Sequence, residues 1–211
     1  HYNSGGDPEY ITDLSYEELQ NFYQRHYHPS NAIFMTYGDI PAIEHQTVFE
    51  EKALAHFELG DTNIHIGREK RYHAPVRVEE AYAFDSEDST EQQTHIVIAW
   101  LLGQNTDLND VLAAQLISYI LLENSACPLQ YYLETTDLGA SPSPLCGLED
   151  SYRELVFSCG ISGSDTEHAD QFEKDVLAII EKTANEGIDE QRLNAILHQI
   201  ELSHREVSGD G

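Results

Sequence analysis

Apolar and polar residues follow a helical period between residues 15 and 26, which predicts an amphipathic helix there. The helix begins with a capping box, because the Ser15 hydroxyl can accept a hydrogen bond from the backbone N–H of Glu18, whose carboxylate can reach back. It ends before Pro29, since the residue that precedes a proline is pushed out of the α region. Spaced as on one helical face are Tyr16, Leu19, Phe22, Tyr23 and His26.

A short apolar run follows this helix. Residues 33–37 read Ile-Phe-Met-Thr-Tyr and predict a buried strand, which ends at Gly38. A second helix is predicted over residues 41–57, with Pro41 in its first turn, where a missing N–H costs nothing. Unless neighbouring strands cover it, the 33–37 strand presents an open sheet edge, through which the chain can associate with another copy of itself.

The apolar period lapses after residue 57. Four of the eleven Lys and Arg residues concentrate here, at Arg68, Lys70, Arg71 and Arg77. We interpret residues 58–78 as a linker between two domains, residues 1–57 and 79–211. A basic patch that binds peptides is the alternative.

The second predicted domain alternates pairs of strands with pairs of helices. Its strands are predicted at 81–84, 95–102, around the two prolines of 142–144, and at 154–161, and its helices at 108–122, 129–135, 172–180 and 189–200. The continuous apolar run at 95–102 is typical of a strand buried on both faces. The 108–122 helix is apolar nearly all round and is expected at the centre of the core. This order indicates an α+β fold, with an antiparallel sheet packed on helices.

Composition excludes several classes of protein. The content of hydrophobic residues is 40%, which can support a core. The sequence contains no run of eighteen apolar residues, so we expect no membrane span. The net charge of −27 repels phosphate backbones and argues against nucleic-acid binding. An acidic surface that keeps the protein soluble and a surface that attracts basic peptides both fit this charge.

The three cysteines, Cys127, Cys146 and Cys159, lack the spacing of a metal site. We interpret them as small buried apolar residues in a reducing compartment, with a Cys146–Cys159 disulfide as the alternative.

Motifs for catalysis are absent from the sequence. It contains neither His-x-x-Glu-His nor His-Glu-x-x-His, and no Gly-x-Ser-x-Gly. The histidine pairs His26/His28 and His198/His204 lack ligand spacing, and His1 has no partner nearby in the sequence. We therefore predict no catalytic and no metal-binding residue. Ser4, Gly5 and Gly6 indicate a backbone of unusual dihedral angles, or a loop that lines a peptide cleft.

One stretch also carries a family resemblance. The pattern Leu19-x-x-Phe22-Tyr23-x-x-His26-Tyr27-x-Pro29-Ser30-Asn31, followed by a strand and Gly38-Asp39, resembles the end of the catalytic domain in pitrilysin/insulinase-type zinc metallopeptidases. The resemblance is more specific to the presequence-protease branch, because of the preceding Ser4-Gly5-Gly6-Asp7-Pro8 and the sequence His-Tyr-His-Pro-Ser-Asn at residues 26–31. Residues 93–97 and 200–206 resemble the same branch more loosely.

The resemblance implies that this chain is an internal segment of a longer enzyme. Residues 1–57 would then end the first, catalytic-type domain, and residues 79–211 would form most of a second, metal-free domain of the same fold. The family's zinc ligands would lie before Ser4, so zinc is expected in the full-length parent and no cofactor in this chain.

The implied role is to help wall a closed chamber in which unfolded or basic peptides are cleaved. The expected partners are the remaining domains of the parent and such peptides, with no nucleic acid and no membrane. The expected location is the bacterial cytoplasm, with the mitochondrial matrix or another organelle as the alternative. The alternative function is that of a scaffold or peptide-binding relative that has lost its zinc and its peptidase activity.

Overall fold

The structure, a computed structural model, describes residues 5–60, 67–85, 89 and 91–206. The chain divides into two compact units, residues 1–69 and residues 70–211. Their boundary falls within the segment 58–78, where the apolar period lapses.

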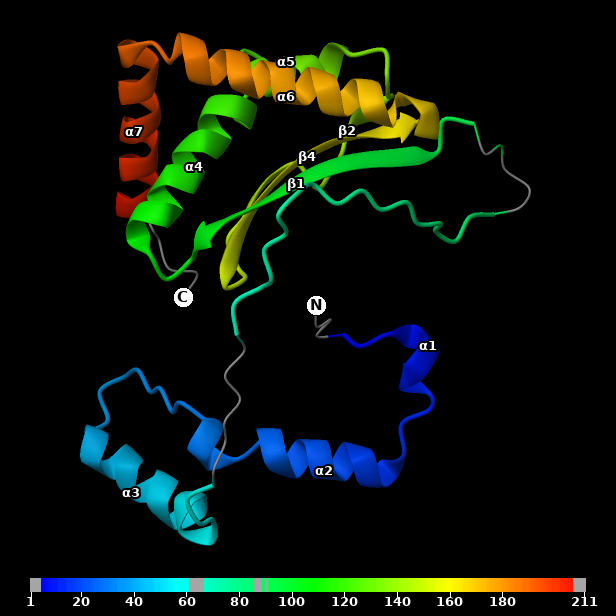
Figure 1. Ribbon diagram of the computed structural model, residues 1–211. Helices are drawn as coiled ribbons and strands as arrows, with labels where there is room; N and C mark the ends of the chain where they lie inside the picture. The colour runs from blue at the N-terminus through cyan, green and yellow to red at the C-terminus, as the bar shows by residue number, and fades with distance from the viewer. Residues whose placement is uncertain (1–4, 61–66, 86–88, 90, 207–211) are drawn as a thin grey trace. The chain divides into compact units, whose positions relative to one another are not determined.

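The described residues of the first unit form three α-helices, α1 (Pro8–Ile11), α2 (Tyr16–His26) and α3 (Ala42–Lys52) (Figure 1). The predicted capping box opens α2, since the Ser15 Oγ accepts the Glu18 N–H at 3.2 Å and the Glu18 carboxylate accepts the Ser15 N–H at 2.8 Å. The helix predicted over residues 41–57 is interrupted, because α3 ends at Lys52 and a separate 3-10 turn covers Leu54–His56.

The strand predicted at residues 33–37 does not form. These residues have no regular secondary structure and pair with no strand within the described part of the chain. Ile33 and Met35 are 97% and 90% exposed, and only Phe34 between them makes a ring contact, with Phe49 on α3 at 4.8 Å between centroids. A strand needs a partner for its N–H and C=O groups, and the first unit supplies none among its described residues.

The second unit contains an antiparallel sheet of four strands, β1 (Thr94–Gln104), β2 (Ser141–Pro142), β3 (Gly147–Glu149) and β4 (Glu154–Ser164). The three others all pair with β4, the last strand in the sequence. In the β1–β4 register Ile96 lies opposite Ile161, Ile98 opposite Cys159 and Trp100 opposite Phe157, so these six side chains share the core face.

Three helices pack on that face, α4 (Leu108–Leu122), α5 (Pro128–Thr135) and α6 (Ala169–Glu186), and a fourth, α7 (Glu190–Arg205), packs against α4 (Figure 1). The core between sheet and helices includes Leu129, Leu133, Phe157, Cys159, Ile161, Phe172, Val176, Ile196 and Ile200. The predicted α+β fold, with an antiparallel sheet packed on helices, is therefore confirmed. Across the described residues, no helix combines the length and the apolar character needed to span a membrane.

Three expectations about the second unit are wrong in detail. Residues 81–84 form no strand, because they make no ladder with β1 or with another described strand. The strand β1 is not buried on both faces: it lies at the edge of the sheet, and Val97 on its uncovered face is 38% exposed. The helix α4 is not wholly central, since Leu108 and Ile117 project into solvent.

Two arginines of the predicted linker bind within the second unit. Arg71 donates to the carbonyl oxygens of Leu101 and Leu102 in β1. Arg77 makes a bidentate ion pair with Glu173 on α6, at 2.7 and 2.9 Å. Their donors are thus engaged inside the protein, which weakens the alternative of a basic patch open to peptides.

Candidate functional site

The candidate cleft loop of residues 4–6 leads into α1. Ser4 lies outside the described residues, whereas Gly5 and Gly6 are described. Gly6 has a φ of +76°, in the left-handed region, and a Cβ at this position would lie 3.4 Å from Cγ1 of Ile11. The following Asp7 accepts the Glu9 N–H at 3.0 Å and caps α1. The glycine therefore serves the turn into α1, and its role in a peptide cleft stays a prediction.

The two histidines at the end of α2 make separate contacts. The His26 ring lies 4.3 Å from that of Phe22. The His28 ring packs on Phe57 at 5.2 Å between centroids, and its Nδ1 accepts the Ser30 N–H at 3.2 Å. Among the described residues, no three His, Cys, Asp or Glu side chains come close enough together to hold a metal ion.

The first unit presents an exposed apolar surface, which we call the α2 surface. No residue of α1, α2 or α3 is buried. The aromatic side chains that the helical period places on one face of α2 are therefore exposed, and Phe22 and Tyr23 are each 58% exposed. We use this name for the exposed apolar residues of α2 and of the segment that follows it, namely Tyr16, Leu19, Phe22, Tyr23, Tyr27, Ile33, Met35 and Tyr37. Apolar exposure on this scale is typical of a face that another protein segment covers.

The three cysteines of the second unit are free thiols. Cys127 and Cys159 are buried, as the sequence predicts, and Cys146 is half-buried. Burial raises the pKa of the Cys146 thiol, and it raises the pKa of Cys159 to about 12, with the neighbouring Cys146 adding to the effect. Both thiols therefore stay protonated near neutral pH and are weak nucleophiles.

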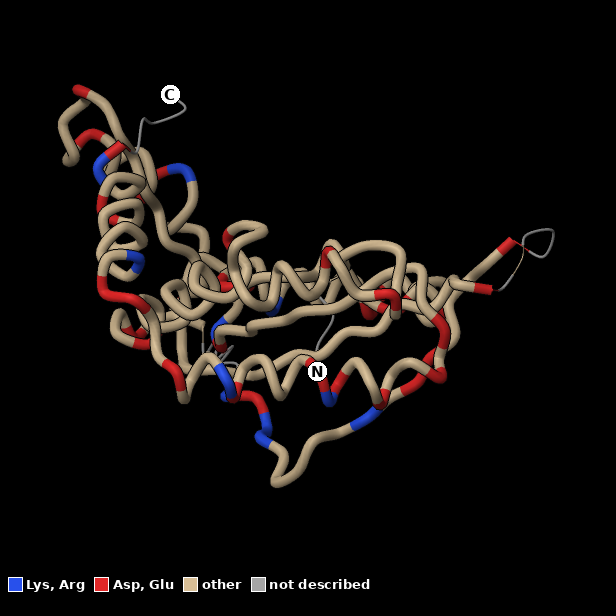
Figure 2. Tube along the Cα trace, turned by 90° about the horizontal axis from the view of Figure 1, so that it is seen from above, with Lys and Arg blue, Asp and Glu red and all other residues tan. Residues whose placement is uncertain are grey.

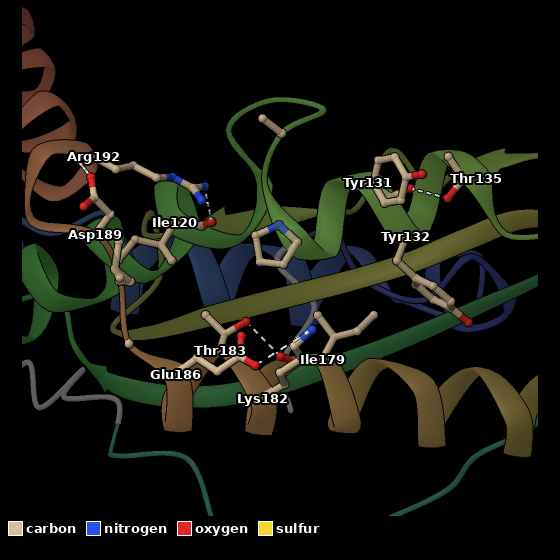
Figure 3. A pocket seen from close by; sticks show the side chains of 14 residues that line it. Ile120, Tyr131, Tyr132, Thr135, Ile179, Lys182, Thr183, Glu186, Asp189 and Arg192 are labelled. Carbon is tan, nitrogen blue, oxygen red and sulfur yellow. Dashed lines mark hydrogen bonds and ion pairs between the residues drawn. The ribbon is translucent and has the colours of Figure 1, made fainter.

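A cavity of about 540 Å³ lies in the helical layer of the second unit, and we call it the α5–α6 cavity (Figure 3). Its walls come from the end of α4, from α5, from the second half of α6 and from the start of α7. The residues that line it are Ile120, Ala126, Pro128, Tyr131, Tyr132, Thr135, Ile179, Lys182, Thr183, Glu186, Gly187, Ile188, Asp189 and Arg192. No sequence motif predicts this cavity, because its residues come from four helices and the turns between them.

Tyr132, at one end of this cavity, has a perturbed hydroxyl. The hydroxyl donates to Asp175 Oδ2 at 3.0 Å. Burial is the main cause that raises the pKa of Tyr132 to about 12, and the charge of Asp175 adds to it. The protonated hydroxyl is thus favoured in the folded state.

This pKa predicts a loss of stability in alkali. A tyrosine in the unfolded chain titrates near pH 10, so between about pH 10 and about pH 12 the unfolded state releases the Tyr132 proton while the folded state retains it. Stability should therefore fall across this window more steeply in the wild type than in Tyr132→Phe, as measured by urea denaturation at each pH. Tyr131→Phe, at the exposed neighbouring position, is the control and should keep the wild-type slope. Parallel curves for wild type and Tyr132→Phe would contradict the assignment.

Comparison with known proteins gives consistent matches. A family model described as "Peptidase M16 inactive domain" matches residues 13–200, and so spans both units. The chain is 34% identical over 202 residues to the mitochondrial presequence protease of Gibberella zeae, covering 95% of this chain and 20% of that protein. It is 35% identical over 210 residues to the protein of the same name from Xenopus tropicalis, covering 97% of this chain and 20% of the relative. The chain thus spans about a fifth of the length of these relatives.

Proposed function

The chain belongs to the M16 peptidase family and matches the domain of that family described as inactive, and on this premise we propose that it is a non-catalytic central segment of a longer zinc metalloendopeptidase that degrades unfolded peptides. Its role there is to help form the wall of the chamber that holds the peptides. The first unit would belong to the end of the catalytic domain, and the second unit would be the metal-free domain that follows.

The α2 surface is the observation that carries this proposal. Within its described residues, a unit in which α1, α2 and α3 bury no residue and residues 33–37 pair with no strand lacks the core that would stabilise it alone. Partner strands and an apolar covering layer supplied by the rest of a longer protein would satisfy both needs. The relatives, which are about five times as long as the part that matches, support this view.

The described residues do not fit a zinc site, since no three potential ligands converge. The proposal therefore places the zinc of the parent outside this chain and assigns no catalytic step to it. Ser4, Gly5 and Gly6 would lie beside the peptide cleft as a loop that approaches the substrate backbone.

The proposed substrates are unstructured basic peptides. Asp and Glu outnumber Lys and Arg by 38 to 11, and Figure 2 shows their positions spread over many parts of the trace. A field of this sign attracts cationic peptides and repels nucleic acids. The names of the relatives, mitochondrial presequence proteases, support such substrates and support the mitochondrial location over the bacterial cytoplasm that we expected first.

The test is cleavage of an unstructured basic peptide, with and without a chelator, by residues 1–211 and by the full-length parent. We expect no turnover by residues 1–211, because no metal site converges among the described residues, and chelator-sensitive turnover by the parent. An otherwise identical peptide with its basic residues replaced by Gln should be cleaved more slowly, and the difference should shrink at high salt. Chelator-sensitive turnover by residues 1–211 alone would refute the proposal. An inactive parent that still binds the peptide would favour the alternative, a zinc-less scaffold.

A further inference from the structure

We propose that the α5–α6 cavity binds the C-terminal end of a peptide whose last residues are apolar. The cavity combines a guanidinium group that retains unused donors, a lining of apolar side chains, and a volume of about 540 Å³. Ligand pockets for small molecules and short peptide ends commonly have volumes of roughly 300–1,000 Å³.

Arg192 provides the anchor for a carboxylate. It lies in the first turn of α7, and its guanidinium extends over the cavity toward Ile120 (Figure 3). Only Nη2 is engaged, donating to the Ile120 carbonyl oxygen at 3.0 Å and to Cys127 Sγ at 3.1 Å. Within the described residues, Nη1 and Nε make no hydrogen bond and no ion pair. Both forks of a guanidinium include Nη2, so an incoming carboxylate would accept single charge-assisted hydrogen bonds from Nη1 or from Nε.

The acidic groups at the rim are already engaged. The Asp189 carboxylate accepts the backbone N–H of Arg192 at 3.1 Å and caps α7. Glu186 lies 3.9 Å from the ammonium of Lys182, one turn earlier on α6. Two cations and two anions therefore line the cavity. Solvent screens the charge of the half-buried Arg192 less than that of the exposed Lys182. We infer that an incoming carboxylate pairs with Arg192.

The remaining lining fits apolar side chains. Ile120, Pro128, Ile179 and Ile188 contribute aliphatic surface, and the rings of Tyr131 and Tyr132 project from α5 on the side of the cavity away from Arg192 (Figure 3). A ligand with its carboxylate on Arg192 can lay one or two apolar side chains along this lining and remove them from water. The required chemistry is thus a carboxylate attached to a short apolar body.

The peptide is chosen as the source of this chemistry on the basis of the proposed function. Every cleavage of a peptide creates a new C-terminal carboxylate, so a protein of this class encounters such ends continually. The test below measures binding and not cleavage. A failure to bind would leave the chamber proposal intact, and an inactive parent would leave the binding result intact.

The experiment compares two probes on the unmodified chain of residues 1–211, namely N-acetyl-leucyl-leucine and the same dipeptide with a C-terminal amide. We expect the free acid to bind with a dissociation constant of about 1 mM or tighter, and the amide to bind at least about tenfold more weakly. In ¹H–¹⁵N spectra the free acid should shift the amide signals of Thr183, Gly187 and Arg192. Equal binding of acid and amide, no binding of either, or shifts confined to other residues would overturn the proposal.

Variants locate the anchor. Arg192→Gln should abolish the preference for the acid over the amide, whereas Arg205→Gln, on the same helix but outside the cavity, should keep it. Lys182→Gln should retain most of the preference, and if it alone abolishes the preference, Arg192 is not the anchor. Because Arg192 also ties α7 to α4, its variant must first show a wild-type spectrum away from the cavity; if it does not, the acid–amide comparison on the unmodified chain decides. Hexanoate is the last probe: binding as tight as that of the dipeptide acid would refute a peptide as the ligand and assign the cavity to free carboxylic acids.

Discussion

Replacement of Phe172 by alanine should lower the free energy of unfolding of the second unit by about 3–5 kcal/mol. Phe172 is fully buried and is the largest of the side chains with no exposed surface. It projects from the first half of α6 into the core, where its ring lies 6.1 Å from that of Tyr132 on α5. Truncation to alanine therefore removes apolar contacts and leaves a cavity between two helices and the sheet.

The measurement is urea denaturation followed by circular dichroism, and Lys174→Ala is the control. Lys174 is exposed on the same helix, so its variant should change stability by no more than about 0.5 kcal/mol. Equal denaturation midpoints for Phe172→Ala and Lys174→Ala would mean that α6 does not pack on the sheet as described.

The backbone amides of the second unit should be protected from hydrogen exchange at least about a thousandfold more strongly than those of the first unit. The amides of β4 lie at the centre of the sheet and should exchange only when the second unit unfolds globally. The amides of α2 belong to an eleven-residue helix with no buried residue, and isolated helices of that length are marginal in water. Residues 33–37, which pair with no strand in the described part of the chain, should exchange fastest of all.

The chain of residues 1–211 is the sample for this comparison, at several concentrations. Protection of residues 33–37 that rises with concentration would show that the α2 surface pairs with a second copy, as the open edge predicts. Protection of α2 equal to that of β4 at every concentration would show instead that the first unit is packed within one chain, and would contradict the account given above.

Local features were predictable because their causes lie within a few residues. The predicted capping box at Ser15 is present, and two further features are equally local: Asp107 caps α4, and Gly187 ends α6 with a φ of +73°. In each case a side chain or a glycine acts on the backbone next to it, so the sequence contains the whole interaction.

Strands were predictable only where a partner lies within the chain. Residues 33–37 and 81–84 have the composition of strands, but the hydrogen bonds that would make them strands must come from elsewhere. The same reasoning applies to β1: its apolar run is typical of a strand covered on both faces, but helices cover only one face, and β4 is its single partner among the described strands. The position of a strand within a sheet depends on pairing partners that lie far away in the sequence.

The candidate sites show the same division. Gly6 was identified from a local signal, and its positive φ accounts for the glycine. Arg192 was missed, because an arginine one turn into an amphipathic helix looks like any solvated charge. Its contacts with Ile120 and Cys127 join residues that lie more than sixty positions apart in the sequence.

The central place of β4 in the sheet has a consequence for synthesis on the ribosome. The strand β1 is an uncharged, largely apolar segment, and the strand that pairs with it is completed only after residue 164. Translation adds about 5–20 residues per second, so several seconds pass between the synthesis of β1 and the completion of β4. During that interval the nascent chain exposes a segment with the composition of an aggregation-prone sequence. The growing polypeptide should therefore depend on chaperones that bind β1 until residue 164 has left the exit tunnel.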